Sequence, residues 1–178
     1  LAARGELDEA LRIRREEELP VYERLGDVRS KAVTMGKIAD VLAARGELDE
    51  ALRIRREEEL PVYERLGDVR SKAVTMGQIA DVLAARGELD EALRIRREEQ
   101  LPVYERLGGV RELIVARTKS ALLLLRRGRV DDAAEAHEYL IWAYENAVRR
   151  NYREAAFIAN VMRQMNLPVP TPARSSDE

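Results

Sequence analysis

Apolar residues recur along the chain at steps of three and four, the spacing of one face of an α-helix. Between Asp27 and Gly46 this face comprises Val28, Ala32, Met35, Ala39 and Leu42. Asp27 suits the N-terminal cap of such a helix, and Gly46 suits its left-handed end. A second segment, Glu47–Gly67, opens with acidic residues that favour a helix N-terminus. Strict alternation of apolar and polar residues is absent, so the sequence predicts an all-α fold.

This two-helix unit repeats every 41 residues. Residues 1–41 and 42–82 differ only at Lys37 and its counterpart Gln78, and further units begin near 83 and 124. Similarity at a fixed period is typical of stacked arrays, in which each unit buries its apolar face against its neighbours. We therefore expect an α-solenoid of antiparallel helix pairs over residues 1–166. A capping helix is expected at about 151–165, and a disordered tail at 167–178.

The apolar pattern also points to a family. The unit has a large residue at Met35, a large–small pair at Ile38–Ala39, a further large residue at Leu42 and a small residue at Ala51. In this spacing the unit resembles a tetratricopeptide repeat of the longer-unit variety. The resemblance implies a right-handed superhelix that binds other proteins. The unit departs from the family pattern at Arg55, where an aromatic residue is expected, at Glu58, where a small one is, and at Pro61 inside the second helix.

Each second helix contains a proline: Pro20, Pro61 or Pro102. A break, a kink or a single π-helical turn would relieve the clash that proline causes in a helix interior. Because the apolar face continues from Leu11 to Val21, we expect a continuous, kinked helix.

Charged residues, Arg14, Glu17 and Glu18, occupy the middle of the same face. Two interpretations stand. They form a ladder of ion pairs with Arg55, Glu58 and Glu59 between successive second helices, or they form a solvated surface.

The sequence offers little for catalysis. His137, the single histidine, falls on an apolar helical stripe and is interpreted as a packing residue, and cysteine is absent. The basic turn at 126–129 is a weak phosphate-binding candidate. We expect no enzyme activity, no cofactor, no metal and no nucleotide site. The net charge of −2 favours neither nucleic acid nor a membrane surface as a partner. The lack of cysteine fits a reducing, cytoplasmic location. Because the chain opens at Leu1 without methionine, we expect a longer natural N-terminus.

A line of residues on each first helix remains after the packing face is assigned, and we call it the groove line. Its members are Val33, Lys37, Asp40 and Ala44, their copies Val74, Gln78, Asp81 and Ala85, and Lys119 in the third unit. The family resemblance implies that this line forms a concave peptide-binding surface. Gly36 and Gly77 beside it would allow a partner backbone to approach, or would serve close helix packing. Asp40 and Asp81 favour an apolar or basic segment as the partner.

The favoured function is therefore a non-catalytic scaffold for protein–protein interaction. Two alternatives stay open: a sensor array of a larger nucleotide-dependent bacterial signalling protein, and a self-assembling structural element. The second helix of the first unit, which is expected to start at Glu6, lacks a complete helix before it. Its face with Leu7, Leu11 and Val21 is therefore expected to be exposed and to form a homodimer.

Overall fold

The computed structural model describes residues 2–170, with side chains from Gly5 onward. Every regular element among these residues is a helix, and antiparallel helices stack along the chain as an all-α solenoid. The prediction of fold class is confirmed. The chain divides into two compact units, Leu1–Ala92 and Leu93–Glu178, and helix α7 (Leu89–Ile95) contains the division.

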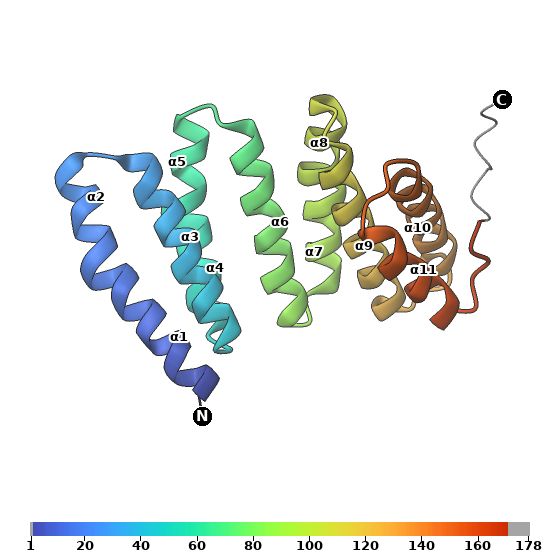
Figure 1. The fold of residues 1–178 in the computed structure, drawn as a ribbon, viewed down its shortest axis with the longest axis horizontal. Helices are drawn as coiled ribbons and strands as arrows, with labels where there is room; N and C mark the ends of the chain where they lie inside the picture. The colour runs from blue at the N-terminus through green and yellow to red at the C-terminus, as the bar shows by residue number, and fades with distance from the viewer. Residues whose placement is uncertain (1, 171–178) are drawn as a thin grey trace. The chain divides into compact units, whose positions relative to one another are not determined.

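Unit 1 alternates second helices with first helices that run antiparallel to them (Figure 1). Its elements in chain order are α1 (Ala2–Arg12), η1 (Ile13–Glu18), α2 (Leu19–Leu25), α3 (Val28–Ala44), α4 (Leu48–Ile54), η2 (Arg55–Glu59), α5 (Leu60–Arg65) and α6 (Val69–Ala85). No turn separates α1 from η1 and α2, which run as one helix, and α4, η2 and α5 do the same. Helix α3 packs on both of these long helices and is the centre of the unit.

The helix ends follow the predicted capping residues. The Asp27 carboxylate accepts a hydrogen bond from the backbone N–H of Ser30 at 2.9 Å, and Asp68 caps α6 through Ser71 at the same distance. Gly46 has a φ of 84°, the left-handed conformation that ends a helix. The expected start of the first unit's second helix at Glu6 is wrong, because Gly5 lies inside α1. Without a described helix to return against, the helix-forming residues around it extend α1 instead.

Each second helix continues through its proline, as predicted, and the irregularity before the proline is a π-helical turn. The backbone N–H of Leu19 bonds to the carbonyl of Arg14, five residues back, and Leu60 bonds to Arg55 in the same way. Proline cannot donate this bond and crowds the carbonyl four residues before it. The wider turn just before Pro20 and Pro61 relieves that crowding without ending the helix.

Unit 2 comprises η3 (Arg96–Gln100), α8 (Leu101–Leu107), α9 (Val110–Arg127), α10 (Asp132–Arg149) and α11 (Glu154–Gln164), besides the end of α7. Helix α11 packs on α10 and α9, with Ile158 and Met162 buried. Residues 167–170 form no helix, and the rest of the predicted tail, 171–178, lies outside the described residues.

Candidate functional site

The centre of unit 1 contains a buried charged side chain, Arg55, at the start of η2. Only 1% of its surface is exposed. Its Nη1 donates to Glu59 Oε2 and to Gln78 Oε1, each at 2.8 Å, and its Nη2 donates to the carboxylate of Asp40. Arg55 therefore joins its own helix to α3, through Asp40, and to α6, through Gln78. A buried guanidinium needs such acceptors, because an unpaired charge is costly away from water.

Glu59, one helical turn after Arg55, is the second buried charge. It is 5% exposed and accepts a hydrogen bond from the hydroxyl of Thr75 on α6 at 3.1 Å. Its carboxylate lies directly against Gly36 of α3, where a Cβ would stand 2.6 Å from Oε1. Gly36 thus makes room for Glu59. Of the two roles considered for this glycine, close helix packing accounts for it.

Burial raises the pKa of the Glu59 carboxyl group above its usual value. The Arg55 charge and the hydrogen bonds from Thr75 and Arg55 act in the opposite direction, and the nearby Asp40 carboxylate adds to the increase. Desolvation is the largest of these effects. Burial therefore makes the charged form of Glu59 less favourable in the folded protein than in water.

The buried pair replaces the predicted ladder between second helices. The partners of Arg55 are Glu59 on its own helix and Asp40 and Gln78 on the flanking first helices. Glu58 instead pairs with the exposed Arg53 of its own helix at 2.9 Å. The first helices lie between successive second helices, so their side chains are the nearer partners. The separation of four residues between Arg55 and Glu59 was the sequence signal for a pair within one helix.

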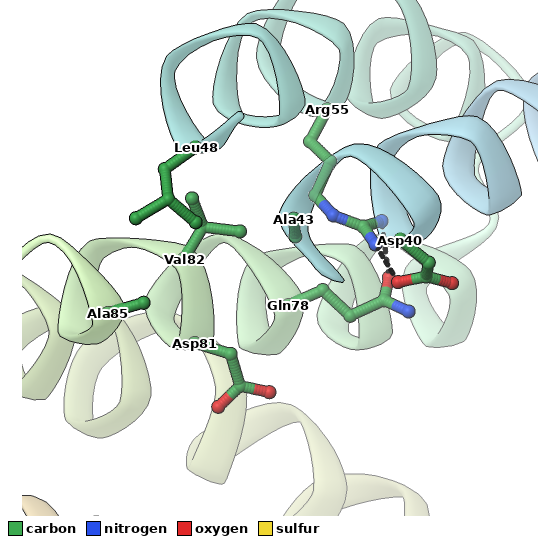
Figure 2. Close-up of a pocket in the computed structure, with 8 residues that line it drawn as sticks. All are labelled: Asp40, Ala43, Leu48, Arg55, Gln78, Asp81, Val82 and Ala85. Carbon is green, nitrogen blue, oxygen red and sulfur yellow. Dashed lines mark hydrogen bonds and ion pairs between the residues drawn. The ribbon is translucent and has the colours of Figure 1, made fainter. Parts of the chain in front are cut away.

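A pocket of about 160 Å³ lies beside Arg55, between α3 and α6. It is lined by Asp40, Ala43, Leu48, Arg55, Gln78, Asp81, Val82 and Ala85. Figure 2 shows the Arg55 guanidinium pointing toward Asp40 and Gln78, with Leu48 beside Val82 on the apolar side of the pocket. The pocket therefore combines an apolar wall with two carboxylates at its border.

The groove line of unit 1 lies at the surface, as its assignment required. Val33 and Val74 are 39% and 41% exposed. Lys37, Asp40, Ala44 and Ala85 are exposed as well, and Gln78 and Asp81 are half-buried. Four members, Asp40, Gln78, Asp81 and Ala85, also line the pocket. Gly36 and Gly77 are buried and do not belong to this surface.

The residues assigned to self-association are exposed to different degrees. Val21 is 39% exposed and Leu7 is half-buried. Leu11 is 8% exposed, so the expectation that it forms part of an open surface is wrong. Helix α3 packs against α1 and shields it, since α3 contacts the second helix before it as well as the one after it.

Unit 2 contains the remaining candidates. Lys119 is exposed on α9, in line with Val115, which is 41% exposed. His137 is half-buried, and its Nε2 is buried without a hydrogen-bond partner among the described residues. In the basic turn, Arg127 forms an ion pair with Asp132 and lowers the pKa of that carboxyl group to about 2. This arginine therefore has a structural role.

Sequence reasoning missed an aromatic cluster in unit 2. The Arg117 guanidinium lies 4.2 Å from the Trp142 ring centroid and 5.7 Å from that of Tyr139. It also pairs with Glu105 at 2.9 Å. Trp142 and Tyr139 are three residues apart on one helix, a spacing that places two rings on the same face.

No group of histidine, cysteine or acidic residues suited to a metal ion occurs in the described part of the chain. Among residues 2–170, no helix combines the length and hydrophobicity needed to cross a bilayer.

Two stretches of the sequence, 39–57 and 78–98, match the tetratricopeptide repeat family. Each stretch runs from the end of a first helix into the following second helix. The fold is similar to that in the crystal structure of BtubC (BKLC) from P. vanneervenii, with a TM-score of 0.55 and 15% sequence identity. The match covers 99% of this chain and 95% of that one. No curated protein sequence matches the chain.

Proposed function

Because the chain contains a tetratricopeptide-repeat array, we propose that it is a non-catalytic scaffold that binds a peptide or protein partner along the groove line of α3 and α6. Repeats of this family generally mediate protein–protein interaction. The observation that carries the proposal is the pocket between α3 and α6, which four groove-line residues help to line.

The chemistry of the pocket favours a basic side chain. Two carboxylates, Asp40 and Asp81, border it, and Arg55 is the only cation among its lining residues. Arg55 is buried and bound to Asp40 and Glu59. The side of the pocket with Leu48 and Val82 is apolar. A lysine or arginine can lay its aliphatic stem on that wall while its charged end stays near the carboxylates.

Val33 and Val74 extend this surface on either helix. Both are exposed and lie four residues before Lys37 and Gln78 of the groove line. An exposed apolar residue near a charged pocket suits a partner segment in which apolar and basic residues alternate along one face.

The test is a peptide array of random 12-residue segments probed with the full chain. We expect bound segments to be enriched in lysine and arginine beside apolar residues. The double variant Asp40→Asn/Asp81→Asn keeps an acceptor oxygen for Arg55 and removes both charges. It should weaken binding of the best segment by about ten-fold, equivalent to 1.4 kcal/mol.

Asp49→Asn is the matched control, because the Asp49 side chain is 88% exposed and lies outside the pocket. It should leave binding unchanged. Enrichment of acidic segments would refute the proposal, as would equal binding by the double variant and the wild-type chain.

A further inference from the structure

Unit 1 contains a second pocket, of about 260 Å³, between α3 and α5, and we call it the back pocket. It is lined by Val28, Lys31, Ala32, Met35, Glu58, Val62 and Arg65. Successive residues of a helix are turned by about 100°. The lining residues of α3 therefore lie on the opposite side of that helix from the groove line. The back pocket is thus separate from the pocket beside Arg55.

The floor of the back pocket is apolar. Ala32 is 1% exposed, Met35 is 8% exposed and Val62 is 9% exposed. Val28, the first residue of α3, is 50% exposed, so the apolar surface continues from the floor to the opening. Between Val28 and Met35 the helix rises by about 10 Å. This surface can accommodate an unbranched hydrocarbon chain, and covering it would remove apolar area from water.

Three charged side chains border this floor, and they differ in their partners. Lys31 pairs with Glu23 at 2.8 Å. Glu58 pairs with Arg53 at 2.9 Å. Among the described residues, Arg65 has one hydrogen bond, from its Nε to the backbone carbonyl four residues earlier, at 3.3 Å. The two Nη atoms of Arg65 therefore have no acceptor there, and the pocket has one guanidinium without a counter-ion.

The positive and negative charges lie at opposite ends of the back pocket. Arg65 follows Val62 by three residues at the end of α5, and Glu58 precedes Val62 by four. The helix rises by about 10 Å between Glu58 and Arg65. An anionic group therefore suits the Arg65 end, where Glu58 does not repel it. From there an attached apolar chain can extend over Val62 toward Met35.

The pocket suits a small ligand better than a peptide segment. Its lining residues all belong to α3, η2 and α5, whose backbone groups bond within their own helices. A peptide lying in the pocket would leave its own backbone N–H and C=O groups without partners. A hydrocarbon chain has no such groups. The volume also lies just below the range of about 300–1,000 Å³ that is typical of pockets for drug-sized ligands.

We propose that the back pocket binds an anionic amphiphile, a fatty carboxylate of medium chain length. Its carboxylate accepts two hydrogen bonds from the Nη atoms of Arg65, a pairing that fits the planar geometry of both groups. Its chain lies on Ala32, Met35 and Val62. Both the ligand and the surface differ from those of the groove line, so the inference goes beyond the proposed function.

The test is isothermal titration of the full chain with decanoate, kept below its micelle concentration. We expect saturable binding. Octanoate should bind about ten-fold more weakly, because it buries two fewer methylene groups. Decyltrimethylammonium has a chain of the same length and the opposite charge, and it should bind at least ten-fold more weakly than decanoate.

A substitution identifies the site. Arg65→Gln should weaken decanoate binding about ten-fold, because it removes the charge from the head-group end. Arg24→Gln is the matched control. Arg24 has the same place in the identical first copy, its Nε bonds to the carbonyl of Pro20 at 3.3 Å, and it does not line the pocket. It should bind decanoate like the wild type. Circular dichroism of both variants checks that they remain folded.

Absence of decanoate binding overturns the inference, and so does binding that Arg65→Gln leaves unchanged. Equal binding of decyltrimethylammonium would show an apolar contact without recognition of the head group and likewise overturns it. Vesicles of phosphatidylcholine and phosphatidylglycerol separate a free amphiphile from a lipid surface. Sedimentation of the chain with these vesicles, without binding of soluble decanoate, would assign the pocket to a membrane surface and overturn the inference.

The two proposals can fail separately. The Asp40→Asn/Asp81→Asn chain should bind decanoate like the wild type, because neither aspartate lines the back pocket. The Arg65→Gln chain should bind the selected groove segments like the wild type, because Arg65 does not line the pocket beside Arg55. Loss of decanoate binding in the double variant would contradict the assignment to the back pocket.

Discussion

The helices around Arg14 and Arg55 have the same sequence and the same backbone irregularity but different surroundings. Each has a π-helical segment before its proline, η1 over Ile13–Glu18 and η2 over Arg55–Glu59. Arg55 is 1% exposed, whereas Arg14 is only half-buried. The difference shows that the local sequence determines the wide turn, whereas the neighbouring first helix determines the burial of its charges.

The two sites also differ in what they contribute. At the Arg55 site, removal of the cation leaves Glu59 buried without a partner charge, which is strongly destabilising. At the half-buried Arg14 site, water replaces a lost partner. Identical substitutions in the two copies therefore separate the effect of burial from the effect of sequence.

The largest difference is expected for arginine to methionine. Arg55→Met should lower the free energy of unfolding by about 3–5 kcal/mol, because Glu59 stays buried without its cation. Arg14→Met should lower it by less than about 1 kcal/mol, the usual range for ion pairs near water. Urea unfolding followed by circular dichroism measures both. Equal losses would mean that coverage by α3 does not decide the energetics.

A smaller difference is expected for glycine-to-alanine substitutions at Gly36 and Gly5, which should change the free energy of unfolding in opposite directions. At Gly36 the added Cβ meets the Glu59 carboxylate. The strain of overpacking should outweigh the gain in helix propensity and lower the free energy of unfolding by about 1–2 kcal/mol.

Gly5 is the control within the same prediction, because nothing lies within 4 Å of its added Cβ. Gly5→Ala should raise the free energy of unfolding by up to about 1 kcal/mol through helix propensity alone. Thermal melts of both variants give the signs. Stabilisation by both would show that Glu59 moves aside without cost.

The smallest effect concerns the charge of Glu59. Its folded-state pKa is raised above the ordinary value of 4.5 for a glutamate, mainly by burial, so the folded state binds the proton more tightly than the unfolded state does. The stability from this group is therefore greatest below pH 4.5 and is lost as pH rises through the folded-state pKa. Glu59→Gln removes that loss and should be more stable than the wild type at pH 7, by less than about 1 kcal/mol.

The advantage of Glu59→Gln should shrink as the pH is lowered toward 4.5. Unfolding curves at pH 4.5 and pH 7 provide the comparison, with the half-buried Glu18→Gln expected to change less. The third copy supports the direction, since Gln100 stands in the place of Glu59, is 6% exposed and accepts from Arg96 Nη1 at 2.8 Å. An advantage larger in acid than at pH 7 would contradict the prediction.

Most of the fold could be predicted from the sequence because its determinants are local. The apolar steps, the Asp27 cap and the Gly46 stop each act within one helix. The continuous passage through Pro20 and Pro61 followed from the same pattern. The apolar steps could not identify the π turn, because the charged residues 14–18 interrupt the apolar face where the turn lies.

The candidate site was only partly predictable. The surface position of Val33, Asp40 and Val74 followed from helical spacing alone. The pairing of Asp40 with Arg55 did not, because it joins two helices whose relative placement the sequence does not give. The burial of Arg55 also contradicts the usual preference of charged residues for the surface.

The near-identity of the first two units has a consequence for folding kinetics. Helices α3 and α6 differ only at Lys37 and Gln78, so the helix of α1, η1 and α2 can accept α6 in place of α3 while the intervening residues form a loop. In that misassembled state Gln78 would supply Arg14 with the acceptor that Lys37 lacks. Local contacts alone therefore do not select the native neighbour. The native arrangement is favoured because it also buries the residues that the misassembled state leaves in a loop. Misassembly of this kind is a characteristic hazard of repeat proteins.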